Sequence, residues 1–181
     1  MRKLTSKQLK SISNNLDYFF NIATTNDIKN GLNWYNNANS LAQNISNKYE
    51  LNIYDVCQVI SCLSPRNKWK QNIKDTDKVC NAFKLGLQPN DIKVCTFHTN
   101  KYKAFNVLNQ NITITNTSLK TFNFVNNIAY LNNDYLTIDI WHLRACFKHS
   151  IKINNASIGK LAYEQIKQLT IKKANNLNLK G

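Results

Sequence analysis

The chain has 181 residues, of which 43% are hydrophobic, and its 24 Lys and Arg against 10 Asp and Glu give a formal charge of +14. Four glycines and two prolines exclude a turn-rich β-sandwich or barrel, no run of eighteen apolar residues could span a membrane, and five cysteines without a CxxC pair argue against a metal site or a disulfide framework. We therefore expect one all-α domain over residues 1–181 around a single core.

Helical periodicity runs through the first half of the chain. The pattern predicts helices over residues 6–23, 34–49, 53–63 and 69–83. Thr5 or Ser6 caps the first of them, and Pro65 follows the end of the third. Because the helix over 53–63 is apolar on more than one face, we expect it to lie at the centre of the core.

Shorter helices are predicted in the second half. They cover residues 100–108, 118–131, a segment that begins after Asp139, and 158–177. A polar hinge at residues 113–117 joins the first two, which predicts a helical hairpin over about residues 100–131. Asp139 is a favourable N-cap for the helix that contains Ile140, Leu143 and Phe147.

The positive charge favours an anionic partner. Nucleic acid is the commonest one, although lysine enrichment from an A/T-rich genome would leave the same excess on a solvated surface. The residues after Met1 are polar and form no apolar signal core. We expect a soluble, cytoplasmic monomer without cofactor or metal, located in the host cytoplasm if a phage encodes it.

Four segments resemble the helix-hairpin-helix DNA glycosylases, the superfamily of endonuclease III and the oxidised-guanine glycosylases. Residues 100–108 (NKYKAFNVL) resemble the helix that supplies the hairpin's first arm. Residues 117–125 (TSLKTFNFV) resemble the start of the hairpin's second helix, and residues 137–144 (TIDIWHLR) resemble the later helix that begins with an Asp. Residues 59–64 (VISCLS), continuing to Asn67 and Asn72, resemble the core helix and the loop that enters the DNA. The likeness covers roughly residues 34–148, but the Leu-Pro-Gly-Val-Gly hairpin signature and the iron–sulfur cysteines of the family are missing.

The resemblance implies a compact helical glycosylase-like fold and double-stranded DNA as the partner. The implied activity is extrusion of a modified or damaged base and cleavage of its N-glycosidic bond, in base-excision DNA repair or in defence. Bifunctional members of the superfamily also cleave the strand through a Schiff base.

Asp139 and Lys120 match the catalytic positions of that superfamily. Cleavage builds positive charge on the deoxyribose, which an ionised carboxylate near C1′ stabilises. A helix N-terminus favours the anion of Asp139 by about 0.3–1 kcal/mol, although an N-cap role alone would also explain this residue. Lys120 matches the nucleophilic lysine of bifunctional members, and its alternative is a lysine that faces phosphate or solvent.

Several other residues are candidates for DNA contact. An extruded base leaves a gap that a wedge must fill, and the loop Ser64-Pro65-Arg66-Asn67 is the candidate wedge, although Pro65 is also a plain helix stop. The backbone N–H groups at Thr117, Ser118 and Leu119 could hold a phosphate, or these residues could form an ordinary helix cap. The remaining candidates are Lys68, Lys70, Lys101 and Lys103 for charge, His142 and Arg144 for phosphates or the pocket, and Trp69 and Trp141 for stacking on a base unless they are core aromatics.

Two other functions stay open. A non-catalytic DNA-binding module could keep this fold with a decayed pocket, and a related enzyme could modify bases in a hypermodified phage genome. The sequence does not identify the base, because the residues that line a pocket would come from several helices.

Overall fold

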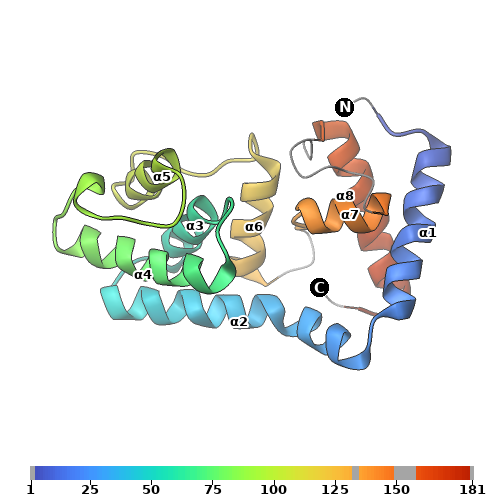
Figure 1. The fold of residues 1–181 in the computed structure, drawn as a ribbon, viewed down its shortest axis with the longest axis horizontal. Coiled ribbons are helices and arrows are strands. Elements are labelled where there is room, and N and C mark those ends of the chain that lie inside the picture. The colour runs from blue at the N-terminus through green and yellow to red at the C-terminus, as the bar shows by residue number, and fades with distance from the viewer. Residues whose placement is uncertain (1–2, 132–134, 149–157, 180–181) are drawn as a thin grey trace. The chain divides into compact units, whose positions relative to one another are not determined.

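The structure is a computed structural model that describes residues 3–131, 135–148 and 158–179. These residues form eight α-helices and one 3-10 turn and contain no β-strand (Figure 1), which confirms the all-α class. None of the described helices combines the length and the apolar character needed to cross a membrane. Contacts divide the chain into two compact units, unit 1 (residues 1–34 and 136–181) and unit 2 (residues 35–135). A single domain over residues 1–181 stays a prediction.

Unit 2 is built around a buried central helix. Its elements are residues 35–49 of α2 (Thr25–Tyr49), α3 (Ile53–Leu63), α4 (Trp69–Lys84), the 3-10 turn η1 (Pro89–Asp91), α5 (His98–Leu108) and α6 (Leu119–Tyr130). Helices α4, α5 and α6 pack against α3, in which every residue from Val56 to Leu63 is buried. The side chain of Asn52 caps α3 by accepting the N–H of Tyr54 at 2.8 Å. The central position predicted for residues 53–63 is therefore confirmed.

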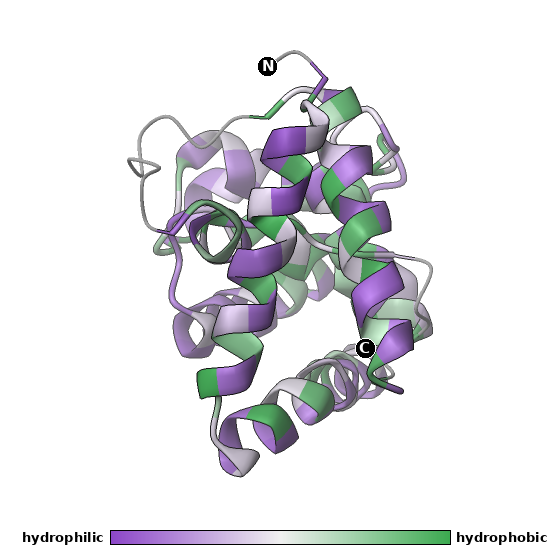
Figure 2. Cartoon of the chain, turned by 90° about the vertical axis from the view of Figure 1, so that its right-hand side faces the viewer, coloured by the Kyte–Doolittle hydropathy of each residue, from purple (hydrophilic) through white to green (hydrophobic). Residues whose placement is uncertain are grey.

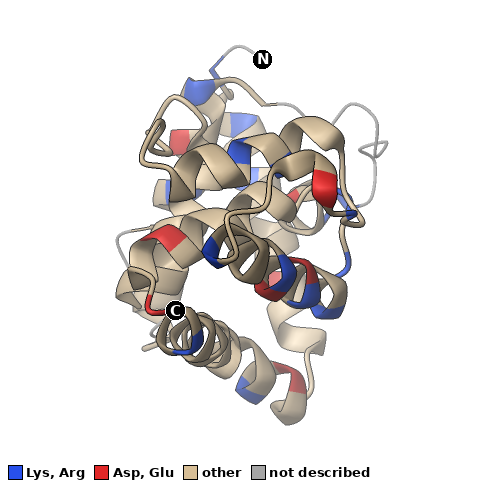
Figure 3. Ribbon diagram, turned by 90° about the vertical axis from the view of Figure 1, so that its left-hand side faces the viewer, with Lys and Arg blue, Asp and Glu red and all other residues tan. Residues whose placement is uncertain are grey.

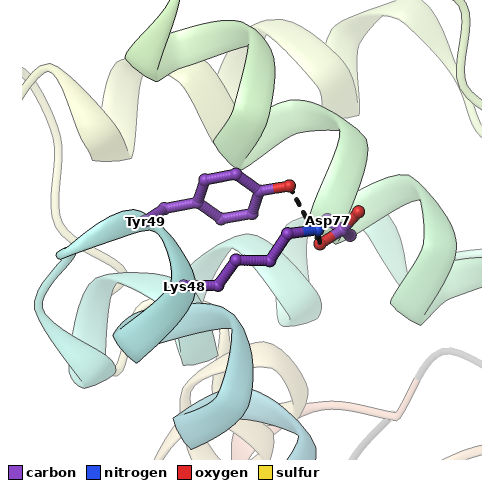
Figure 4. Close-up of polar contacts among 3 residues, drawn as sticks. All are labelled: Lys48, Tyr49 and Asp77. Atoms are coloured by element: carbon purple, nitrogen blue, oxygen red, sulfur yellow. Dashed lines mark hydrogen bonds and ion pairs between the residues drawn. The ribbon is translucent and has the colours of Figure 1, made fainter.

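A polar cluster of three side chains joins α2 to α4 at the surface of unit 2 (Figure 4). The Oδ1 atom of Asp77 accepts hydrogen bonds from Lys48 Nζ at 2.8 Å and from the Tyr49 hydroxyl at 3.0 Å. The hydrogen bond to Asp77, with that to Tyr49, raises the pKa of Lys48 above its ordinary value. The cluster fixes the last turn of α2 beside the middle of α4.

Unit 1 contains residues 25–34 of α2 together with α1 (Ser6–Ile22), α7 (Ile140–Phe147) and α8 (Lys160–Asn176). Helix α1 packs against α7 and α8, and hydrophobic and hydrophilic residues alternate along these helices (Figure 2). The side-chain amide of Asn15 donates to the carbonyl of Cys146 at 2.8 Å, and the hydroxyl of Tyr163 donates to the carbonyl of Leu136 at 2.8 Å. These bonds supplement the apolar packing, since they satisfy two backbone carbonyls inside the unit.

The observed helix ends agree with the predicted ones to within a residue or two, with one exception. Helix α2 begins at Thr25 and not at Trp34. Thr24 starts it, because the hydroxyl of Thr24 accepts the N–H of Asp27 at 3.2 Å while Asp27 Oδ2 accepts the N–H of Thr24 at 3.0 Å. This reciprocal cap explains why the helix begins at Thr25, although the residues up to Trp34 include Gly31 and form no clear apolar stripe.

Candidate functional site

Asp139 is the N-cap of α7. Its backbone is extended (φ −97°, ψ −174°), and its Oδ1 atom accepts the backbone N–H of His142 at 2.9 Å. The residue is half-buried, and within the described residues no further hydrogen bond reaches its carboxylate. One oxygen therefore fixes the orientation of the group while the other is free to interact with a positive charge.

The ring of His142 lies between α7 and α8. Its Nε2 atom is 3.2 Å from the hydroxyl of Thr170. Burial lowers the pKa of His142 below its ordinary value, and the carboxylate of Asp139 opposes that change. The imidazole is therefore uncharged at neutral pH, so it adds hydrogen-bonding capacity beside Asp139 but no positive charge for a phosphate.

The two tryptophans predicted to stack on a base have different surroundings. Trp141, in the first turn of α7, has 66% of its surface exposed, and the guanidinium of Arg144 lies 4.6 Å from the centre of its ring. Trp69 is partly buried and packs against the apolar core of unit 2. Trp141 is thus an open aromatic surface, whereas Trp69 fits the alternative of a core aromatic.

The segments predicted to form the hairpin are α5 and α6, and polar bonds to α3 hold the segment between them. The side chain of Gln58 accepts the N–H of Ile114 at 2.7 Å and donates to Asp55 at 3.1 Å. Asp55 in turn accepts the side-chain amide of Gln110 at 2.8 Å, and Gln110 has a left-handed backbone with φ 61°. These side chains hold the segment between α5 and α6 on α3. The sequence analysis missed Gln58, because it stands inside an apolar helix.

The start of α6 has no side-chain cap. Ser118 occupies the N-cap position, but its hydroxyl donates to the Thr121 hydroxyl at 3.1 Å instead of accepting a backbone N–H. The hydroxyls of Thr115 and Thr117 bond to each other at 2.9 Å, and Lys120 is exposed in the first turn. The alternative of an ordinary serine cap therefore does not describe this helix end, and its N–H groups stay available to solvent or to an anion.

The loop between α3 and α4 contains the predicted wedge residues. Ser64 is the C-cap of α3, Arg66 is exposed with a left-handed backbone (φ 56°), and Lys68 is the exposed N-cap of α4. The side-chain amide of Asn67 donates to Asp75 at 2.9 Å, and the carbonyl of Pro65 accepts the hydroxyl of Thr96 at 3.1 Å. Arg66 is therefore the exposed one of the four predicted wedge residues.

The lysines do not form one group. Lys70 is exposed and Lys103 half-buried, whereas Lys101 is 3% exposed and donates to the carbonyl of Ile92 at 2.7 Å. The prediction that Lys101 contacts a phosphate is therefore wrong, since its ammonium group lies inside unit 2. Its spacing from Ala104 and Leu108, which are also buried, places it on the inner face of α5. Figure 3 shows that lysine and arginine are spread over several helices of the chain.

Asp139 belongs to unit 1 and Lys120 to unit 2. A common catalytic site for the two side chains, which the resemblance implies, stays a prediction.

The model of DUF7178, described as a family of unknown function, matches residues 1–180. Neither a curated protein nor a solved structure matches this chain significantly.

Proposed function

This chain belongs to DUF7178, and we propose that it is a DNA glycosylase that binds double-stranded DNA, extrudes a modified or damaged base and cleaves the N-glycosidic bond. The observation that carries the proposal is the carboxylate of Asp139, which is fixed by one oxygen at the start of α7 and open at the other. The resemblance of residues 117–125 and 137–144 to glycosylase segments supports the choice of reaction.

Asp139 has the properties that the bond cleavage needs. As the bond between C1′ and the base nitrogen breaks, the electron pair leaves with the base and C1′ gains positive charge. An anion next to C1′ stabilises that charge, provided that it is already oriented before the reaction. The N–H of His142 orients Asp139 through Oδ1, so the open oxygen can face the sugar or a water molecule that attacks it.

The start of α6 supports binding to the DNA backbone. Free N–H groups and the helix dipole together favour an anion at a helix N-terminus, and the hydroxyl of Ser118 leaves those N–H groups uncapped. Lys120 and Thr117 are exposed beside them. A phosphate bound here would place the DNA against the hairpin without reading its sequence.

Lys120 is proposed as the nucleophile of an additional lyase step. After transfer of a proton to water, its amine would bond to C1′ as the base departs with the electron pair, and opening of the sugar ring would give a Schiff base. Loss of a proton from C2′ would then eliminate the 3′ phosphate and break the strand. Its place in the first turn of α6, beside the proposed phosphate site, supports an approach to the DNA backbone.

A second candidate is a DNA-binding module without catalysis. The exposure of Lys120 favours it, because an exposed lysine at a helix start is suited to a phosphate contact without any chemistry. Both candidates require DNA binding, and they differ in whether an abasic site is formed.

Oligonucleotides with uracil, oxidised, alkylated or glucosylated bases separate the candidates. Asp139→Asn is the decisive variant, because asparagine caps a helix as well as aspartate does but has no charge. Base release by the wild type that is lost in Asp139→Asn supports a glycosylase. Borohydride trapping of a covalent adduct, lost in Lys120→Ala but kept in the matched surface variant Lys84→Ala, supports the lyase. Binding without an abasic product from any base supports the module, and absence of binding overturns both candidates.

A further inference from the structure

We propose that Phe97 and Arg66 form a stacking platform for an unpaired nucleobase, so that unit 2 binds single-stranded DNA through its bases as well as its phosphates. The inference rests on the proposed function in taking DNA as the ligand. Phe97 precedes α5 and is 50% exposed, and the guanidinium carbon of Arg66 lies 5.4 Å from the centre of its ring. A half-exposed aromatic ring with a guanidinium over it offers two planar groups that can stack on any base.

The backbone at Arg66 is held in an unfavourable conformation. Its φ of 56° lies in the left-handed region, which a residue with a Cβ atom adopts only when its surroundings require it. The N–H of Asn67 donates to the carbonyl of Ser64 at 3.1 Å and closes a turn around Arg66. The side-chain amide of Asn67 is also bound to Asp75. Arg66 is therefore directed outward by a fixed turn and not by a mobile loop.

Asp75 holds together the two segments of the platform. It is 3% exposed, and its carboxylate accepts the side chains of Asn67 and Gln71 and the backbone N–H of Cys95, each at 2.9 Å. A second link joins the same segments, because the hydroxyl of Thr96 donates to the carbonyl of Pro65. A surface that is fixed before binding loses little entropy when a ligand stacks on it.

The two segments that carry Arg66 and Phe97 contain positively charged residues and no negatively charged ones. Residues 56–74 and 92–131 contain no Asp or Glu. Lys68, Lys70 and Lys93 are exposed within these segments, and the neighbouring Asp75 is buried and bound by three donors. A strand whose phosphates are negative and whose bases are planar matches both the charge and the aromatic surface.

Fluorescence anisotropy with two single-stranded probes tests the platform. One probe is an oligothymidylate of about 16 nucleotides, and the other is an oligomer of abasic sites with the same number of phosphates. Phe97→Ala is expected to weaken binding of oligothymidylate about tenfold and to leave binding of the abasic oligomer unchanged. Phe97→Tyr should restore the affinity, and Leu85→Ala, which removes another exposed apolar side chain of unit 2, should not alter it.

Two results would overturn the platform. In the first, Phe97→Ala binds oligothymidylate with the wild-type affinity while its thermal transition is that of the wild type. In the second, Phe97→Ala loses the same factor of affinity for both probes. Base release from duplex DNA, together with either result, would leave the proposed glycosylase intact. Absence of binding to duplex and to both single-stranded probes would overturn the proposed function and the platform together.

Discussion

Asp139 and His142 are coupled in two ways across the first turn of α7. The carboxylate of Asp139 accepts the backbone N–H of His142 at 2.9 Å, and its negative charge opposes the effect of burial on the pKa of the His142 ring. The backbone bond orients the carboxylate. Because the pKa of the ring responds to the charge of the carboxylate, the ring serves as a probe of that charge.

Asp139→Asn is expected to lower the pKa of His142 further. The variant removes the charge that favours the imidazolium, whereas burial by α8 continues to disfavour it. The ring protons of His142 followed by NMR as a function of pH give this value directly. An unchanged pKa would show that the two side chains do not interact, and Asp17→Asn, on α1, is the control for a general loss of negative charge.

Folding stability should decrease as the pH falls below about 6.5, the ordinary pKa of histidine. Because the pKa of His142 is lower in the folded protein, the unfolded chain takes up a proton first, and protonation therefore favours unfolding. The difference in the free energy of unfolding between wild type and His142→Gln should be larger at pH 7 than at pH 5. Urea denaturation at the two values measures it, and equal differences would contradict the expectation.

Only Cys95 should react with iodoacetamide in the folded protein. Burial raises the pKa of Cys57, Cys80 and Cys146 to about 12 and that of Cys62 to about 11, so these thiols stay protonated and covered at pH 8. Cys95 is exposed. Mass spectrometry should find one added group before denaturation and five after it, and rapid labelling of a second cysteine in the native state would show that the core opens.

Asp75→Asn should destabilise unit 2 by about 1–3 kcal/mol, since an amide cannot accept all three hydrogen bonds and leaves a buried donor unpaired. Asp77→Asn is the matched control in the same helix. Its side chain is 40% exposed, so the loss of its pair with Lys48 should destabilise the protein much less than Asp75→Asn does. Chemical denaturation compares the two variants, and faster alkylation of Cys95 in Asp75→Asn would report local loosening of the platform segments. Equal stability of the two variants would contradict the role given to Asp75.

Gln58→Leu should loosen the segment between α5 and α6. Leucine fills the buried space but leaves the N–H of Ile114 without its acceptor, which costs about 1–3 kcal/mol. Hydrogen exchange at Ile114 should accelerate more than exchange within α3. Unchanged protection at Ile114 would show that the segment holds its shape without Gln58.

Apolar periodicity predicted the helices of this protein well but predicted its polar contacts poorly. Residues 53–63 are apolar on more than one helix face, which predicted a central helix, and α3 is indeed buried. The start of α2 could not be predicted from apolar periodicity, because the helix begins at a reciprocal cap between Thr24 and Asp27 and its first turns carry no apolar stripe. Long-range partners such as Gln58 and Ile114 are set by packing between helices, which a local pattern does not contain.

The candidate residues show the same difference between local patterns, which are predictable, and long-range contacts, which are not. The N-cap role of Asp139 follows from short-range chemistry and was predictable. The buried position of Lys101 could also have been found, because its spacing from Ala104 and Leu108 is that of an inward helix face. Phe97 gave no such signal, because its exposure depends on how the segments at 64–67 and 95–97 are tied together.

The interior position of Lys101 changes how the formal charge of +14 should be understood. A cation that is bound to a carbonyl inside the protein displaces no counterions from a nucleic acid. The slope of affinity against salt concentration counts only cations that meet phosphates. The electrostatic footprint of this protein is thus smaller than its amino-acid composition suggests.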